Sequence, residues 1–411
     1  MSDSQAQNAQ PQTNAPRSKL FRSTAIVTAI VLVILGLLWA GGVLSGRSAE
    51  QKLAAIEAAR AIPDEENAAV IYTKLATTLD VPAVNRTFTN LVMSTVGSTV
   101  YTRPWPSSRY PQLADFIENQ QDVLSTLKRA SIKEKCRFSI GLEPNRFPQL
   151  ARVFWSMRLW QNLLVVAANN DIAEGRIEEA VEKYLCLIRM ARHLYQKPVF
   201  HQFNVGFGFE TSALTNLGRL VIQENLSQDD LNIIDEALSQ IPYDYAGDWA
   251  AVGEVMQLYD EYQIEKMGLW GRLRLHFANL TSRGRPMTFL DGVHASFRQD
   301  YHRVCALRYG TRVLIALRRY RDQHGNWPKS LDEIKTVTPA EIFVDPMTDK
   351  EFVYSVSNED FRLYSVGLNK VDEDGRRDPE FIALGLDMRD DIPVWSVNPV
   401  EHTEDFDDFR W

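Results

Sequence analysis

A run of 24 residues without any charged side chain, Ser23 to Gly46, constrains the fold of this chain more than any other feature. A helix needs roughly 20 apolar residues to cross the hydrocarbon core of a bilayer. The apolar region of a secretory signal peptide is shorter, at roughly 7–15 residues, which makes a cleaved signal the weaker alternative. The run therefore predicts a single transmembrane helix over residues 23–46.

The residues that flank this run indicate its orientation. Arg17, Lys19 and Arg22 precede it, and a similar number of cations follows it. Because these counts differ so little, the positive-inside rule alone does not settle the orientation of the predicted helix. The short polar segment 1–22 favours an N-terminus in the cytoplasm more than the count does. That segment lacks apolar periodicity and is expected to be a disordered cytoplasmic tail. We therefore expect a single-pass inner-membrane protein with its bulk outside the cytoplasm, in the periplasm.

The overall composition is that of a globular chain. The protein has 411 residues, of which 45% are hydrophobic, enough for two or three domains with sizeable cores. The net charge of −8 and the lack of a patch rich in Lys and Arg argue against a nucleic-acid partner. Three cysteines are too few for a disulfide framework, although one bond between Cys136 and Cys186 stays open.

Apolar residues recur at helical spacing from residue 47 to residue 296, which predicts one extracytoplasmic helical domain. Ser227 and the acids after it are typical of a helix start, and Pro63 with the acids after it is expected to open another helix. The main expected helices cover residues 47–61, 111–130, 147–170, 175–196, 205–224, 227–240 and 246–268.

Residues 168–190 resemble the turn and second helix of a tetratricopeptide unit. Gly175 stands at the turn, Ala180 stands where two helices pack closely, and Tyr184 fills the next layer. A solenoid needs about three such units, and the chain shows one, so an ordinary helical hairpin is the alternative. Either arrangement implies a groove for a protein partner rather than a catalytic site.

A smaller α+β domain is expected over residues 297–395, because helical spacing gives way to strand-like alternation near Phe352. An apolar stripe predicts an amphipathic helix over residues 304–320, with Arg308 facing away from the stripe. Gly325 is expected to end this helix in the left-handed conformation. Alternating residues then predict two strands, 351–357 and 361–366.

This order of residues resembles the soluble domain of the major pseudopilin of type II secretion systems. The matching residues are Tyr320, His324 to Pro328, Leu331, Asp345, Pro346, Phe352, Tyr354, Phe361, Leu363 to Gly367 and Asp390 to Ile392. The resemblance covers about a quarter of the chain, and similar segments are familiar from membrane-anchored proteins of planctomycete-like bacteria. The leader and the N-terminal core segment of pseudopilins have no match here, so the resemblance implies a shared fold without polymerisation.

The resemblance also implies a calcium site, because the last loop of the pseudopilin domain binds calcium. The corresponding oxygen ligands in this chain are Asn369, Asp372, Asp374 and Asp391. Hard cations take several oxygen ligands, which clustered carboxylates supply. A solvated acidic turn is the alternative, because Lys370 and two nearby arginines offset the charge of the loop.

The sequence contains no catalytic motif: neither GxSxG nor HExxH, neither a phosphate-binding loop nor a dinucleotide fingerprint. We therefore expect a membrane-anchored scaffold or protein-interaction protein, linked to a secretion or cell-envelope assembly, with an acidic tail at 396–411. The alternative is a hydrolase-like enzyme in which His193 or His201 meets Glu210. A deep pocket that joins histidines and carboxylates would favour the enzyme, and an open groove would favour the scaffold.

Overall fold

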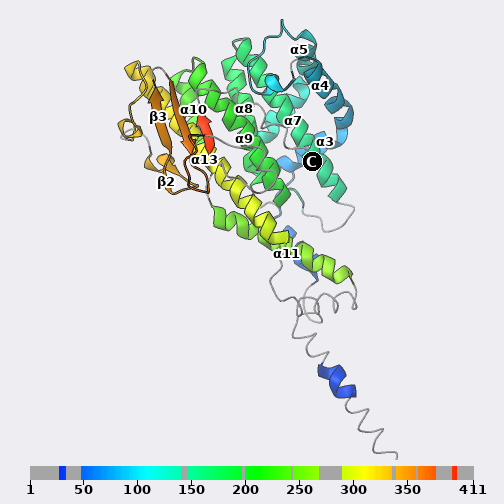
Figure 1. Ribbon diagram of the computed structural model, residues 1–411. Coiled ribbons are helices and arrows are strands. Elements are labelled where there is room, and N and C mark those ends of the chain that lie inside the picture. The colour runs from blue at the N-terminus through cyan, green and yellow to red at the C-terminus, as the bar shows by residue number, and fades with distance from the viewer. Residues whose placement is uncertain are drawn as a thin grey trace, which may run out of the picture.

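The structure is a computed structural model of the chain. It describes residues 27–33, 48–95, 97–139, 147–196, 200–241, 244–267, 289–335, 339–357, 360–375 and 391–395. Within these ranges the fold is mainly helical, with a small strand region that follows the helices (Figure 1). The helical middle and the late strands agree with the sequence predictions.

The structure corrects the prediction of a transmembrane helix over residues 23–46. In the part of the chain that it describes, no helix is both long enough and apolar enough to cross a membrane. The described helix within the predicted span covers residues 27–33, which is about 10 Å at roughly 1.5 Å per residue. The predicted single-pass topology, inner-membrane location and extracytoplasmic placement rested on this helix and are corrected with it. The rest of the span and the predicted tails 1–22 and 396–411 lie outside the described residues.

The long helices precede the strands in chain order. The helical elements up to α13 are α2 (Ala49–Ala59), α3 (Ala68–Thr78), α4 (Val81–Thr95), the 3₁₀ helix η1 (Gly97–Tyr101), α5 (Pro111–Glu118), α6 (Gln121–Ser131), α7 (Phe147–Ala173), α8 (Ile177–Leu194), α9 (Phe200–Gln223), α10 (Gln228–Ser239), α11 (Tyr245–Lys266) and α13 (Phe289–His324).

The strands form two small antiparallel sheets after α13 and the 3₁₀ helices η2 (Leu331–Glu333) and η3 (Ala340–Phe343). The first sheet pairs β1 (Val344–Asp345) with β2 (Lys350–Glu351). The second has the order β3-β4-β5 and consists of β3 (Val353–Ser357), β4 (Asp360–Ser365) and β5 (Ile392–Trp395). In Figure 1 the labelled strands β2 and β3 lie at the opposite side of the molecule from α3, α4 and α5.

Local signals set several helix ends where the sequence placed them. Ser227 caps α10, because its hydroxyl accepts the Asp230 N–H while the Asp230 carboxylate accepts the Ser227 N–H. Gly175 joins α7 to α8 with a φ of 76°, and Gly325 follows α13 with a φ of 78°. Both values lie in the left-handed region that favours glycine.

Two helix boundaries differ from the prediction. Helix α3 begins at Ala68 and is capped by the Asn67 side chain, so the acids after Pro63 form a turn instead of its first residues. The predicted helix 111–130 is interrupted by a turn at Asn119 and Gln120 and becomes α5 and α6.

Helices α7 and α8 form the predicted hairpin, and α8 also packs against α9 (Figure 1). Ala180 and Tyr184 on α8 are fully buried, and the Tyr184 hydroxyl donates a hydrogen bond to Asn169 Oδ1 on α7 at 2.8 Å. These contacts explain why a small residue and then a large one follow the Gly175 turn. The relationship to tetratricopeptide units stays a prediction.

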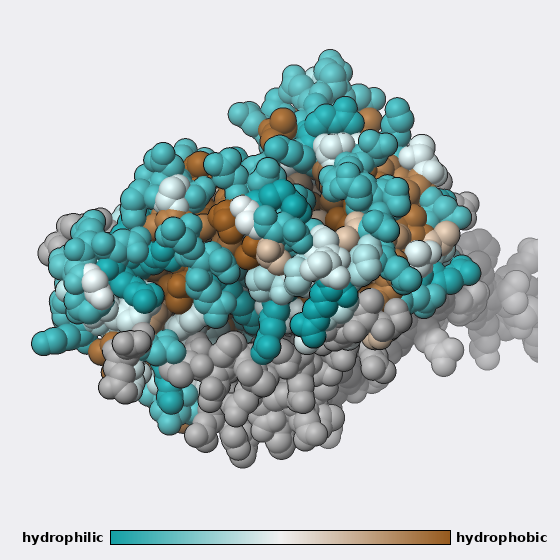
Figure 2. Space-filling view, turned by 90° about the horizontal axis from the view of Figure 1, so that it is seen from above, coloured by the Kyte–Doolittle hydropathy of each residue, from teal (hydrophilic) through white to brown (hydrophobic). Residues whose placement is uncertain are grey.

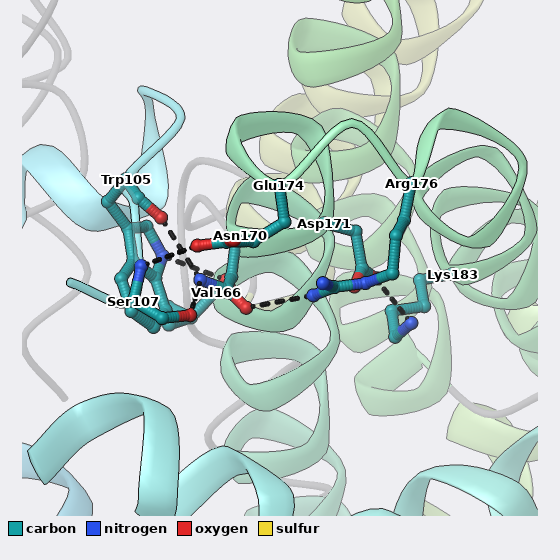
Figure 3. A network of polar contacts seen from close by, with 8 residues as sticks. All are labelled: Trp105, Ser107, Val166, Asn170, Asp171, Glu174, Arg176 and Lys183. Carbon is teal, nitrogen blue, oxygen red and sulfur yellow. Dashed lines mark hydrogen bonds and ion pairs between the residues drawn. The ribbon is translucent and has the colours of Figure 1, made fainter. Parts of the chain in front are cut away.

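A network of polar contacts holds the loop that follows η1 against this hairpin (Figure 3). Asn170 Nδ2 donates to Trp105 O at 3.1 Å and to Ser107 Oγ at 3.0 Å. Asn170 Oδ1 accepts a hydrogen bond from Arg176, whose Nε is 2.8 Å from Asp171 Oδ1. Because these groups bond to one another between two segments of the fold, we assign the network a structural role.

Helix α13 is the central element of the second half of the chain. It packs against α9 and α10 and also against β5 and η3. A Cβ atom on Gly310 of α13 would lie 2.4 Å from Val394 Cγ2, so β5 approaches α13 at a position where only glycine fits without a shift. Helix α13 also passes through residue 296, where the sequence predicts a boundary between two domains, and that boundary stays a prediction.

His193 connects three parts of the fold. Its Nδ1 lies 3.0 Å from the Tyr72 hydroxyl of α3, and its Nε2 lies 2.6 Å from Lys133 O, which follows α6. Burial lowers the pKa of His193 to about 4, although the hydrogen bond to the Lys133 carbonyl opposes this shift. His193 is therefore neutral in the folded protein and has a structural role.

The depressed pKa of His193 predicts a loss of stability in acid. A histidine in the unfolded chain has a pKa of about 6.5. The contribution of neutral His193 to the free energy of unfolding is therefore complete above about pH 6.5 and is lost as the pH falls towards 4. We expect the loss of unfolding free energy between about pH 7.5 and about pH 4.5 to be roughly 2 kcal/mol larger in wild type than in His193→Gln. Urea unfolding at both pH values measures this difference, and equal losses in the two proteins would contradict it.

Candidate functional site

An open cavity of about 430 Å³ lies between α8, α9, α11 and α13. Ligand pockets in proteins commonly have volumes of about 300–1,000 Å³. The rings that line the cavity are Tyr195, Phe203, Phe207 and Tyr301, and its charged groups are Arg192, Asp248 and Arg308. The cavity therefore combines an aromatic wall with a small number of polar groups.

Arg308 of α13, which lines the cavity, forms an ion pair with Glu210 of α9. Arg308 Nε lies 2.5 Å from Glu210 Oε1, and Arg308 Nη2 lies 3.0 Å from Glu210 Oε2. Arg308 is 3% exposed and Glu210 is 0% exposed. Burial alone would lower the pKa of Arg308, but the Glu210 carboxylate outweighs it and raises that pKa, so Arg308 stays charged.

Tyr195, just after α8, closes one side of the cavity. Its hydroxyl donates to Glu210 Oε2 at 2.8 Å. A Cβ atom on Gly206 of α9 would lie 2.6 Å from Tyr195 Cε1, so the ring rests directly on the backbone of that helix. Burial and the neighbouring Glu210 carboxylate raise the pKa of Tyr195 well above its ordinary value, and the phenol stays protonated.

The opposite side of the cavity is fixed by Tyr301 and Asp248. The Tyr301 hydroxyl donates to Asp248 Oδ2 at 2.8 Å and accepts a hydrogen bond from Asp244 N at 2.9 Å. Burial raises the pKa of Asp248, and the hydrogen bond from Tyr301 opposes this shift. Burial also raises the pKa of Cys305 to about 12, and a protonated thiol is a poor nucleophile.

The cavity is thus arranged for binding more than for proton transfer. The predicted meeting of a histidine with Glu210 does not occur at His193, because His193 bonds Tyr72 and Lys133 while Glu210 bonds Arg308. The side chain of His201 lies outside the described residues. Cys136, Cys186 and Cys305 are all free thiols, so the bond between Cys136 and Cys186 that the sequence allowed is not formed. Burial raises the pKa values of Cys136 and Cys186 as well.

A shallow groove between α8 and α10 continues from the cavity. Its volume is about 200 Å³, and it shares Arg192, Gln240 and Ile241 with the cavity. Its remaining lining residues are Leu185, Ile188, Arg189, Ile233, Glu236 and Ala237. The groove therefore has a mixed lining, in which aliphatic side chains alternate with polar residues and with charges of both signs.

The structure brings the four predicted calcium ligands to one region but engages their oxygens with other groups. Asp372 Oδ1 accepts hydrogen bonds from Tyr364 and from Asp374 N, and Asn369 Oδ1 accepts one from Val371 N. Asp374 is exposed, and its Oδ1 lies 3.7 Å from Arg362 Nη1. In the described ranges, no three or more His, Cys, Asp and Glu side chains are grouped so as to hold a metal ion.

Asp391 is the buried member of this set. Its Oδ2 accepts hydrogen bonds from Glu373 N at 3.0 Å and Gly375 N at 2.8 Å, which tie it to the predicted loop. Asp391 Oδ1 and Glu373 Oε2 are both buried without a hydrogen-bond partner. Burial, together with the neighbouring Glu373 carboxyl, raises the pKa of Asp391 to about 7, against the hydrogen bond from Gly375. Two unpaired oxygens leave room for a cation or a proton, and calcium stays a prediction.

Comparison with known proteins adds no assignment to this geometry. No family model, no curated protein and no solved structure matches the chain. The resemblances to pseudopilins and to tetratricopeptide units therefore stay predictions, and the site is interpreted from its own residues.

The sequence did not reveal the cavity, and it placed Arg308 wrongly. Arg308 was expected to face away from the apolar stripe of its helix, but α13 has packing partners on several sides and Arg308 is buried. One signal was present: Glu210 is the only Asp, Glu, Lys or Arg residue between Lys197 and Arg219. Buried charges are normally paired, so a lone carboxylate in such a stretch indicates a cationic partner elsewhere in the chain.

The buried pair predicts a strong asymmetry between single and double substitutions. We expect Glu210→Ala to lower the unfolding free energy by about 3 to 5 kcal/mol, because Arg308 would stay charged and buried without its partner. The double variant with Glu210→Met and Arg308→Met should recover most of this loss, since no charge is then buried. Urea unfolding of the three proteins tests this, and a double variant as unstable as the single one would contradict it.

The calcium hypothesis predicts a shift in thermal stability of the full chain. A ligand that binds only the folded form raises the melting midpoint, so excess calcium should raise it relative to chelator. Asp391→Asn should abolish the shift, because it removes the buried charge next to Glu373. An unchanged midpoint in wild type, or a shift that survives in Asp391→Asn, would exclude calcium at this position.

Proposed function

We propose that the chain is a protein-interaction protein that holds a segment of a partner polypeptide in the groove between α8 and α10. The observation that carries the proposal is Ile233 of α10, a lining residue of the groove that is 51% exposed. Ile233 is not isolated, because Leu185, Ile188, Ala237 and Ile241 line the same groove, and a contiguous apolar surface is the kind that a partner covers.

The walls of the groove explain what kind of segment fits. Leu185 and Ile188 of α8 face Ala237 of α10 and form an apolar floor between two helices. Amphipathic helices bind in grooves of this kind through apolar residues spaced along one face. The upper face of the molecule in Figure 2 is mostly hydrophilic, with small separate hydrophobic patches, so a local groove fits this surface better than a broad apolar interface.

The groove also carries charged side chains of both signs, Arg189 and Glu236. Arg189 Nη2 lies 2.6 Å from Glu182 Oε1, so its charge is already balanced, while Glu236 is exposed on the opposite wall. Rim charges of this kind contribute more to specificity and association rate than to affinity. We therefore attribute the affinity of the groove to its apolar floor and to Ile233.

The groove predicts that peptides selected for binding depend on Ile233. Peptides from a displayed random library, selected on the full chain, should bind Ile233→Glu at least tenfold more weakly, because a charge would replace a buried apolar contact. The matched control is Ile132→Glu, since Ile132 is 64% exposed and lies after α6. Fluorescence anisotropy measures the dissociation constants.

Two outcomes would overturn the proposal. The library could yield no peptide with saturable binding, or the selected peptides could lose affinity equally for Ile233→Glu and Ile132→Glu. Circular dichroism of both variants confirms that a loss of binding does not come from unfolding.

A further inference from the structure

We propose that the cavity at the end of the groove binds a small aromatic carboxylate, with its ring against Phe203, Phe207 and Tyr301 and its carboxylate at Arg192. This inference goes beyond the peptide groove, because the ring-binding walls belong to α9 and α13 and not to α8 or α10. It concerns a second site with a ligand of a different class.

The wall of the cavity is built from rings that already contact one another. The centroids of Phe203 and Phe207 are 5.6 Å apart, and those of Phe207 and Tyr301 are 6.1 Å apart with an edge-on angle of 88°. The three rings are themselves nearly buried, at 1%, 7% and 5% exposure, which keeps them in place. Aromatic pairs favour offset or edge-on contacts at such distances, and a ligand ring would make such a contact with the small exposed parts of Phe207 and Tyr301.

The charged groups around the cavity differ in whether they are already balanced. Arg308 is paired with Glu210, and Asp248 accepts a hydrogen bond from Tyr301. Arg192 is half-buried, and its hydrogen bond to Gln240 Oε1 at 3.3 Å involves a neutral partner. Among the described residues, Arg192 forms no ion pair with a carboxylate. A ligand that supplies one carboxylate at this point could pair with Arg192 without breaking an ion pair of the described residues.

The position of Arg192 favours a small aromatic carboxylate as the ligand of the cavity over the aromatic side chain of a bound peptide. Arg192 stands with Gln240 and Ile241 in the part of the lining that the cavity shares with the groove. A phenylalanine side chain inserted from a peptide would place a neutral backbone amide there. A planar carboxylate on a short linker instead matches the two parallel N–H groups of a guanidinium.

The test uses the full chain and two probes that differ only in charge. The probes are 4-fluorophenylacetate and its uncharged amide, followed by fluorine NMR. We expect the acid to bind at least tenfold more tightly than the amide. Arg192→Gln should weaken the binding of the acid by about tenfold and leave the binding of the amide unchanged. Val304→Phe, which places a larger side chain in the cavity wall, should abolish the binding of both probes.

The matched control is Arg129→Gln, because Arg129 is an exposed arginine of α6 that bonds Thr126 and lies outside the cavity. It should bind both probes as wild type does. The proposal is overturned if neither probe binds, if acid and amide bind equally, or if Arg129→Gln weakens the acid as much as Arg192→Gln does. It is also overturned if Val304→Phe binds normally, or if N-acetylphenylalanine amide binds as tightly as the acid, which would assign the cavity to a peptide side chain.

The two proposals fail separately in these experiments. Ile233→Glu changes the groove and should leave the binding of 4-fluorophenylacetate unchanged, whereas Val304→Phe changes the cavity and should leave the selected peptides bound. Loss of peptide binding alone therefore removes the interaction function, and loss of acid binding alone removes the ligand site.

Discussion

The ion pair between Glu210 and Arg308 is the contact on which the cavity depends. Two buried charges are costly to remove from water, and that cost is offset only when the partners meet with good geometry. Here the two parallel hydrogen bonds fix α9 against α13, and the hydroxyl of Tyr195 joins the same carboxylate. The end of α8 and the two long helices are thereby held in one arrangement, and the cavity is the space left between them.

Close approach of backbone to side chain is the second constraint around the same helices. Gly206 lets the ring of Tyr195 rest on α9, and Gly310 lets Val394 of β5 rest on α13. These glycines lie within helices, where glycine costs roughly 1 kcal/mol relative to alanine. The cost is understandable because each position admits a contact that any Cβ atom would block. The ion pair and Gly310 together explain how α13 packs against both α9 and β5.

Features decided by neighbours in the sequence were predictable, and features decided by distant residues were not. The cap at Ser227, the turn at Gly175 and the hairpin of β3 and β4 depend on residues a few positions apart. The partner of Arg308 is 98 residues away, and no local pattern identifies it. Amphipathic spacing misplaced Arg308 because the rule assumes one buried face, whereas the residues of α13 around it are buried on most faces.

Arg192 and Arg308 show how one residue type serves two purposes in the same cavity. Both guanidiniums are always charged at ordinary pH, so each needs either solvent or an acidic partner. Arg308 is almost inaccessible and obtains its partner from α9, which makes it part of the framework. Arg192 keeps some contact with solvent and bonds the amide of Gln240, so pairing it with a ligand carboxylate requires no ion pair among the described residues to break. The difference in burial therefore decides which arginine builds the site and which one is left to recognise what enters it.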